Sequence, residues 1–324
     1  MTVLIVEPLD IDVLHWLGER HAVQLAPELA TDLRAFRRAL SAVRAVIAPP
    51  SVPLDAPTLQ WAPHLRIVGR LSAGSENIDT ETCTRLGIEV VRPAGDAATA
   101  EAEFVVGALL QMLRRVPILS DGGLLVGRKL GGSTVGIVGM AAPVQSLVPL
   151  LSAFGARMVG YDPGLHAIDP AWRRLGVEPL GLTELLRASD AVAVLLPYYP
   201  RYVGLFGERL LAECRRDQVI VSLSHSSLFD AAALAQALTV GPLAAAWFDS
   251  AEPGLLDHGR PLCHVDTLQV TPRVSGTTLQ SRTRSAWSVV RRLDELLRSL
   301  PPTSTFKPGP KAAPAGSEGA PAPV

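Results

Sequence analysis

The chain has 324 residues, of which 48% are hydrophobic and 19% are charged. This length and composition exclude a disordered protein and predict two domains with cores of ordinary size. Thirty lysines and arginines against 31 aspartates and glutamates leave a formal charge of −1, which excludes the basic surface of a nucleic-acid-binding protein. No apolar run approaches the roughly 20 residues that cross a membrane, and the N-terminus reads as a strand rather than a signal peptide. We therefore expect a cytoplasmic protein.

The positions of cysteine and histidine predict no metal site. Cys83, Cys214 and Cys263 are far apart along the chain and form no Cys-x-x-Cys pair, so neither a disulfide framework nor a cysteine-type zinc site is expected. Six histidines show no metal-ligand spacing with cysteines or acidic residues, and we interpret them as surface or capping residues. They are His15, His21, His64, His166, His258 and His264.

Short apolar runs in the first hundred residues predict parallel strands, because strands covered on both faces are apolar at consecutive positions. These runs cover residues 3–6, 45–48, 65–68 and 88–91. Residues 32–40 repeat apolar side chains at helical spacing, and the apolar stretch 103–113 has no helix breaker, so both are predicted helices.

A second series of strands and helices begins at residue 134. Predicted strands cover residues 134–139, 157–161, 190–196, 218–223, 243–248 and 268–270, and predicted helices cover 144–154, 182–188, 208–214 and 229–238. Regular alternation of this kind predicts an α/β protein with a doubly wound parallel sheet. An amphipathic helix follows at 286–300, and the proline- and alanine-rich residues 301–324 are predicted to be a disordered tail.

The segment 134–162 has the layout of a dinucleotide-binding strand–helix–strand unit. A strand ends at Gly139, and Asp162 follows 23 positions later, where a carboxylate accepts hydrogen bonds from ribose hydroxyls. The second and third glycines of the usual Gly-x-Gly-x-x-Gly loop are replaced by Ala141 and Val144, and Pro143 removes one N–H from the anion-binding end. The loop alone leaves two interpretations open, a nucleotide site or a strand–helix–strand unit that binds no nucleotide.

Several further motifs, in this order along the chain, resemble those of the D-isomer-specific 2-hydroxyacid dehydrogenase family. Residues 69–79 are similar to the loop that holds the substrate carboxylate, and Leu196-Pro197 matches the segment after a nucleotide-domain strand. Asp249, Glu252 and Pro253 match the family's Asp-x-x-Glu-Pro stretch, and residues 271–276 match the loop that carries its catalytic histidine.

The resemblance implies a Rossmann-type sheet domain, residues 98–287, inserted in a flavodoxin-like substrate domain, residues 1–97 plus 288–300. It also implies a homodimer, an active site between the domains and a small-molecule carboxylate substrate bound by Ala73, Gly74 and Ser75. The cofactor it implies is NAD rather than NADP, since Asp162 repels a 2′-phosphate. The cofactor-binding residues that it implies are Gly139, Ala141, Ala142, Pro143, Asp162, Leu196, Pro197, Ser224, Asp249 and Gly276.

Two catalytic positions of the family are exchanged in this chain. His225 occupies the position of the family's arginine, Arg273 occupies that of its histidine, and Glu252 is in place. A guanidinium stays protonated at any working pH, so Arg273 cannot transfer a proton, and we expect it to form an ion pair with Glu252. An imidazole titrates near neutral pH, which leaves His225 as the acid–base candidate, although the sequence identifies no carboxylate partner for it.

Three interpretations of the exchange remain open. In the first, Arg273 binds the substrate carboxylate and His225 handles the proton of a hydride transfer. In the second, the chain is a catalytically silent homologue that binds a ligand or regulates another protein. In the third, the same cleft performs a non-redox reaction, such as that of a lyase or a transferase.

Overall fold

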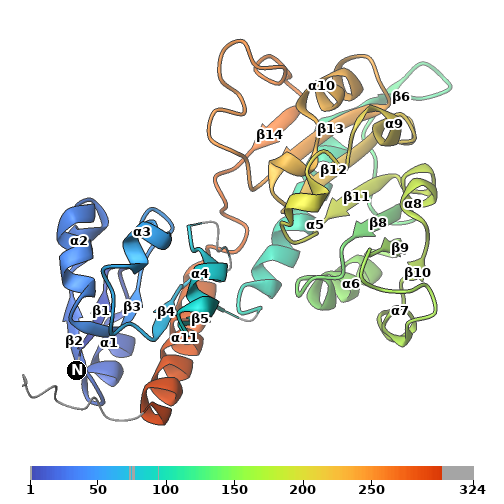
Figure 1. Cartoon of the computed structure of the whole chain (residues 1–324). Helices are drawn as coiled ribbons and strands as arrows, with labels where there is room; N and C mark the ends of the chain where they lie inside the picture. Colours follow the sequence, from blue (N-terminus) through green and yellow to red (C-terminus); the bar gives the residue numbers. More distant parts are fainter. Residues whose placement is uncertain (1, 73, 75–76, 94, 301–324) are drawn as a thin grey trace, which may run out of the picture.

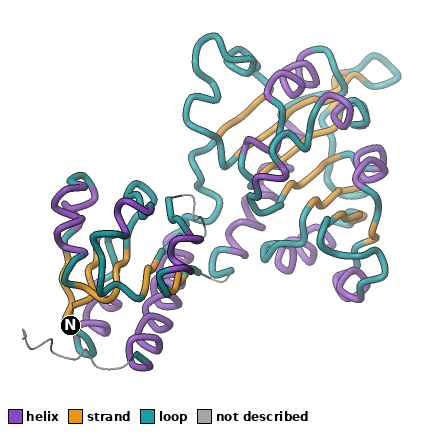
Figure 2. Tube along the Cα trace, in the orientation of Figure 1, coloured by secondary structure: helices purple, strands orange, loops and turns teal. Residues whose placement is uncertain are grey.

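The computed structural model describes residues 2–72, 74, 77–93 and 95–300, and it contains two parallel β-sheets from successive parts of the chain (Figure 1). Ala73, Ser75 and the predicted tail at 301–324 lie outside the described residues. Helices lie on both sides of the strands (Figure 2), which confirms the predicted α/β class. Among the described helices, none has the length and apolar character needed to cross a membrane.

The first sheet has the strand order β2-β1-β3-β4-β5. Its strands are β1 (Thr2–Ile5), β2 (Ala22–Leu25), β3 (Val43–Ile47), β4 (Ile67–Gly69) and β5 (Glu89–Val91). The helices between them are α1 (Ile11–Gly18), η1 (Pro27–Ala30), α2 (Leu33–Leu40), α3 (Ala56–Leu59) and α4 (Thr80–Arg85). Strand β2 was absent from the sequence prediction because it lies at the sheet edge and is mostly exposed, so it shows no continuous apolar run.

The second sheet has the strand order β10-β9-β8-β11-β12-β13-β14. Its strands are β8 (Thr134–Val138), β9 (Arg157–Tyr161), β10 (Glu178–Pro179), β11 (Ala191–Val194), β12 (Gln218–Ser222), β13 (Leu243–Phe248) and β14 (Leu268–Val270). The chain builds outward from β8 to β10, then crosses back to β11 and builds in the opposite direction. Ligands of doubly wound sheets bind at the carboxyl ends of the strands where this reversal occurs, here between β8 and β11.

Two apolar cores cover the faces of the second sheet. On β11, Ala191 and Ala193 belong to one core, and Val192 and Val194 belong to the other, as the alternation of strand side chains requires. The first core packs against α5 (Ala98–Arg115), α6 (Val144–Ala153) and α7 (Pro170–Leu175), and the second packs against α8 (Leu182–Ala188), α9 (Glu208–Leu211) and α10 (Ala231–Thr239). Two short 3-10 helices, η2 (Pro200–Tyr202) and η3 (Ser226–Leu228), follow β11 and β12.

Helix α11 (Leu279–Ser299) returns the chain to the first sheet. Its buried residues Ala286, Val289 and Leu293 share one core with Val3 and Ile5 of β1. The helix starts earlier than the sequence periodicity predicted, because Thr278 caps it by accepting a hydrogen bond from the Ser281 N–H. It therefore runs through the boundary expected between residues 287 and 288. The division into two domains remains a prediction.

Candidate active site

The carboxyl ends of the second sheet bring the candidate residues to one edge. Gly139 follows β8, Leu196 follows β11, His225 follows β12, Asp249 follows β13 directly, and Arg273 follows β14. Because these strands are parallel and adjacent, the residues after them meet at the same end of the sheet. Residues that are far apart in the sequence thus share one site.

Gly139 makes a turn that no other residue fits. Its backbone has φ +97°, and a Cβ atom added there would lie 2.7 Å from the Leu196 nitrogen. The Gly139 N–H donates to the Tyr161 carbonyl over 2.7 Å. The ends of β8, β9 and β11 consequently approach one another closely, as in a nucleotide-binding turn.

Asp162 fastens the loop that follows Gly139. One carboxylate oxygen accepts a hydrogen bond from the Met140 N–H over 2.7 Å, and the other accepts one from the Gly164 N–H over 2.7 Å. Each oxygen retains a second acceptor site, so the contacts leave room for ribose hydroxyls. The same carboxylate therefore shapes the loop, and its contact with ribose hydroxyls stays a prediction.

The bulky residue of the altered glycine loop is accommodated inside the protein. Val144 is the first residue of α6 and is 1% exposed. It belongs to the core of the second sheet that contains Ala191 and Ala193. Ala142 lies against residue 95, since a Cβ atom added to Gly95 would be 3.2 Å from the Ala142 methyl. The loop therefore keeps a compact path despite its substitutions.

His225 has the carboxylate partner that the sequence did not reveal. Its Nδ1 lies 3.8 Å from a carboxylate oxygen of Glu252, a neighbour that the sequence alone did not identify. Glu252 was assigned to Arg273 in the sequence, and that pair stays a prediction. The ring of His225 also contacts the ring of Tyr198, with centroids 5.0 Å apart. Strands β12 and β13 are adjacent in the sheet, so the loops that follow them bring residues 225 and 252 together.

The serines beside His225 connect the loops of the site. The Ser227 hydroxyl lies 2.8 Å from His225 Nδ1, and the Ser226 hydroxyl accepts a hydrogen bond from the Glu252 N–H over 2.9 Å. The Ser224 hydroxyl donates to the Leu196 carbonyl over 2.8 Å. Sequence reasoning assigned Ser224 to the cofactor and missed the positioning roles of Ser226 and Ser227.

The contacts with Ser227 and Glu252 lie on one side of the His225 ring. Both are made at Nδ1, and Nε2 is on the side of the ring away from them. The side chain is 17% exposed, so it is partly open to the surroundings. Nε2 is therefore the ring atom suited to meet a substrate proton.

Asp249 anchors the loop that carries Arg273. It is 3% exposed, and its carboxylate accepts hydrogen bonds from the N–H groups of Val274 and Ser275 over 2.9 and 2.8 Å. Its carbonyl accepts from the Arg273 N–H over 2.7 Å. These bonds hold Arg273 in the left-handed region, at φ +56°, with its side chain exposed. Asp249 thus holds the loop in place, and its assignment to the cofactor stays a prediction.

Glu101 is a second carboxyl group at the same edge, and it is half-buried. Burial raises its pKa, and the negative charge of Asp249 raises the pKa further. A Cβ atom added to Gly276 would lie 3.1 Å from a Glu101 carboxylate oxygen, so the loop after Arg273 passes directly over the start of α5. No sequence motif marked Glu101, because its position depends on this close approach.

Arg70 frames the predicted carboxylate-binding loop of the first sheet. Its guanidinium is 1% exposed and donates hydrogen bonds to the Ser72 hydroxyl, over 2.8 Å, and to the Asn77 side-chain oxygen. Asn77 donates in turn to the Pro49 carbonyl over 3.2 Å. Of the three residues predicted to bind substrate, Gly74 is the one that the structure describes. It lies in the chain between Ser72 and Asn77, which Arg70 holds by hydrogen bonds. The roles of Arg70 and Asn77 were missed in the sequence.

The fold and this edge define an α/β protein of the Rossmann-like class. The sequence model described as "D-isomer specific 2-hydroxyacid dehydrogenase, NAD binding domain" matches residues 111–275. The chain therefore belongs to the D-isomer specific 2-hydroxyacid dehydrogenase family.

Individual relatives agree with this assignment. The chain is 30% identical over 298 residues to D-3-phosphoglycerate dehydrogenase of Mycobacterium tuberculosis, covering 89% of this chain and 55% of the relative. It thus spans about half the length of that enzyme. It is 31% identical over 256 residues to glyoxylate reductase of Aeropyrum pernix, covering 74% of this chain and 76% of the relative. The TT0316 protein of Thermus thermophilus has a similar structure, with a TM-score of 0.77, 26% identity and coverage of 92% and 97%.

Proposed function

We propose that this protein is an NAD-dependent oxidoreductase that transfers hydride between the nicotinamide and a small 2-hydroxy or 2-oxo acid. In this proposal His225 is the acid–base residue, Glu252 orients it, and Arg273 binds the substrate carboxylate. The observation that carries the proposal is the 3.8 Å approach of Glu252 to His225 Nδ1. An acid–base histidine is commonly oriented by a carboxylate at one ring nitrogen while the other nitrogen meets the substrate.

The chain's own residues fit a dinucleotide. The turn at Gly139 leaves no Cβ atom between the strand ends, and Asp162 retains acceptor sites beside the loop. When bound, the nicotinamide supplies or accepts the hydride. During reduction His225 would give the proton held at Nε2 to the substrate oxygen, and the guanidinium of Arg273 would hold the carboxylate through paired hydrogen bonds.

A silent ligand-binding homologue is the second candidate, and Asp249 favours it. Both oxygens of this carboxylate accept hydrogen bonds from the 271–275 loop, which limits the contacts that it offers to a nicotinamide. Binding of NADH without turnover of any 2-oxo acid would identify this second function. A non-redox reaction in the same site would instead leave NADH unbound.

Calorimetric titration tests the cofactor first. We expect NADH to bind the purified chain with a micromolar dissociation constant, and NADPH to bind more weakly because Asp162 repels the 2′-phosphate. Replacing Asp162 with serine removes this repulsion, so we expect the preference for NADH over NADPH to narrow or reverse. If the folded wild-type chain shows no heat with NADH, NADPH or NAD, the hydride-transfer proposal fails.

We further propose that the protein is a cytoplasmic homodimer that pairs through the hairpin of β6 (Ile118–Leu119) and β7 (Leu125–Val126). Leu119, Leu124 and Leu125 of this hairpin are 66%, 67% and 73% exposed, and the hairpin projects from the body of the second sheet (Figure 1). A contiguous exposed apolar patch of this kind favours association. The cysteines are all free, which supports a reducing compartment.

Light scattering after size-exclusion chromatography tests the dimer. We expect the wild-type chain to elute at twice the chain mass, and the double variant Leu124→Asp, Leu125→Asp to elute at the chain mass, because buried aspartates would cost more than the interface gains. Ile168→Asp is the matched control, since Ile168 is 86% exposed but lies outside the hairpin. A monomeric wild-type chain, or a double variant that remains dimeric, would contradict this interface.

A further inference from the structure

The connection between β13 and β14 is the long loop drawn in orange in Figure 1, and residues 249–267 contain no helix or strand. Loops of more than about 12–15 residues without secondary structure are uncommon in compact domains and usually carry a function. The first part of the loop supplies Asp249 and Glu252 to the active site. The second part, from Asp257 onward, has no role in the proposed reaction.

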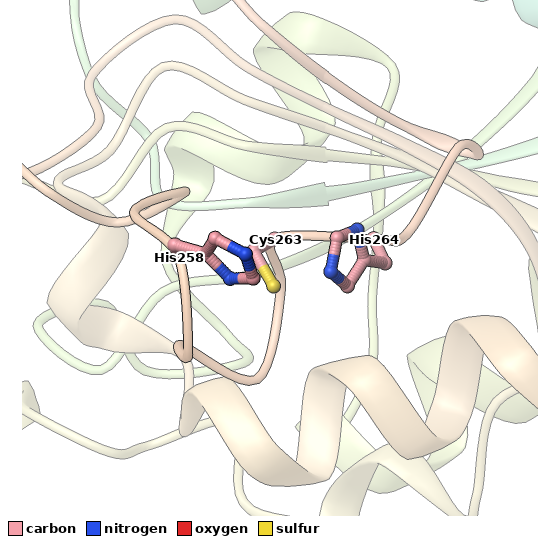
Figure 3. Close-up of side chains that lie close together, drawn as sticks. All are labelled: His258, Cys263 and His264. Atoms are coloured by element: carbon pink, nitrogen blue, oxygen red, sulfur yellow. The ribbon is translucent and has the colours of Figure 1, made fainter.

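Three metal-binding side chains converge in this second part. The ring nitrogens of His258 and His264 and the sulfur of Cys263 all lie within 4.8 Å of one another. Figure 3 shows the sulfur between the two imidazole rings, which meet edge to face with centroids 5.7 Å apart. Both histidines were predicted to be surface or capping residues, since His-x-x-x-x-Cys-His is not a familiar ligand spacing.

The backbone of the loop holds these side chains together. The Arg260 N–H donates to the Asp257 carbonyl over 3.0 Å, and the Cys263 N–H donates to the Arg260 carbonyl over 3.2 Å. These turns bring His258 back toward Cys263. Leu262 is 2% exposed and belongs to the core of the second sheet, so it fixes the position of the adjacent Cys263.

The donor set selects the kind of ion. Two imidazole nitrogens and one thiolate are borderline-soft ligands, which suit zinc and do not suit calcium or magnesium. Zinc bonds of about 2.0–2.1 Å to nitrogen and about 2.3 Å to sulfur place tetrahedral ligand atoms roughly 3.4–3.6 Å apart. The separations of up to 4.8 Å are wider than this, but His258 and His264 are exposed, so their rings have room to rotate toward an ion.

Copper fits the surroundings less well than zinc. A blue-copper site adds a weak axial ligand, commonly methionine, to two histidines and a cysteine. The described methionines lie elsewhere: Met112, Met140 and Met158 all belong to, or pack against, the core on the opposite face of the second sheet from Leu262. The described residues contribute three metal-binding side chains of the His, Cys, Asp and Glu types to the cluster, so we assign the fourth position to solvent.

We propose that His258, Cys263 and His264 bind one Zn²⁺ ion, with a water molecule at the fourth position. The cysteine coordinates as the thiolate, so its proton is released to solvent on binding. The ion would cross-link the ends of a loop segment that starts six positions after Glu252. The residues between them form a turn in which the Leu255 N–H donates to the Glu252 carbonyl over 3.2 Å. Zinc would thereby stabilise the loop that presents the partner of His225.

Titration of the reduced, untagged full chain with Zn²⁺ and Co²⁺ tests this site. We expect one equivalent of Zn²⁺ by calorimetry, and with Co²⁺ a thiolate-to-cobalt charge-transfer band together with the visible bands of a tetrahedral ion. Cys263→Ser should abolish the charge-transfer band and weaken Zn²⁺ binding on the order of 100-fold or more, exceeding the effect of losing an outer hydrogen bond to a ligand. His264→Gln should weaken binding similarly.

His64→Gln is the matched control, because His64 is exposed and lies on the first part of the chain. We expect it to bind Zn²⁺ as the wild type does. Wild-type binding below one equivalent, a missing charge-transfer band, or unchanged binding in Cys263→Ser would each overturn the proposal. If Cys263→Ser fails to fold, His264→Gln decides the question alone, since this exposed side chain does not support the core.

Discussion

Replacing His225 with alanine is expected to lower kcat for 2-oxo acid reduction by about 100- to 10,000-fold, the range that general acid–base catalysis contributes. His225 is the acid–base candidate of the site, and its Nε2 lies on the side of the ring away from Ser227 and Glu252. Steady-state kinetics with NADH measures the loss. The affinity for NADH, measured by calorimetry, should change little because the cofactor residues are untouched.

Positioning variants separate the chemistry of His225 from its support. Glu252→Gln keeps the shape of the side chain but removes the charge 3.8 Å from Nδ1, and we expect it to lower kcat by about 10-fold and to shift the pH profile of kcat. His64→Gln, on the exposed surface, should leave both unchanged. Turnover that survives in His225→Ala would show that another group transfers the proton, and the assigned roles would then be wrong.

The sequence located the inner strands of the second sheet because they are buried on both faces. The predicted ranges 157–161 and 243–248 agree with β9 and β13, where apolar residues dominate consecutive positions, and 268–270 agrees with the edge strand β14. The elements that were missed lie at edges or project into solvent. Strand β2 is largely exposed, and the β6–β7 hairpin contributes exposed leucines, so neither carries the pattern of a covered strand.

The sequence suggested which residues belong to the candidate site, but it did not predict which of them contact one another. Motif order placed His225, Glu252 and Arg273 along the chain, yet the approach of Glu252 to His225 depends on how two loops fold beside each other. Ser226 decides this locally, because its hydroxyl accepts the Glu252 N–H and its own N–H donates to the Ser250 carbonyl over 2.9 Å. Such bonds form because β12 and β13 are neighbours in the sheet. The spacing of residues along the sequence does not show which strands are neighbours.

Substituting alanine for Gly139 is expected to reduce the free energy of unfolding by at least about 3 kcal/mol, which places it among the most destabilising single changes. Alanine at φ +97° carries the cost of a left-handed residue, about 1–2 kcal/mol. Its Cβ atom would also lie 2.7 Å from the Leu196 nitrogen and 2.8 Å from the Leu195 carbonyl carbon. Both are backbone atoms just after β11, the strand next to β8 in the sheet. The collision is therefore relieved only by separating β8 from β11. Denaturant unfolding followed by circular dichroism measures the loss.

Gly132→Ala separates the cost of the left-handed backbone from the cost of the collision. Gly132 has a similar backbone, with φ +83°, but a Cβ atom added there meets nothing within 4 Å. We expect this control to lose only about 1–2 kcal/mol and to bind NADH as the wild type does. Gly139→Ala should in addition bind NADH poorly even where it is folded, because the turn that opens the nucleotide site is displaced. Equal losses of stability in the two variants would mean that the strand ends tolerate a methyl group at Gly139, and the close approach of β8 to β11 would then not constrain this site.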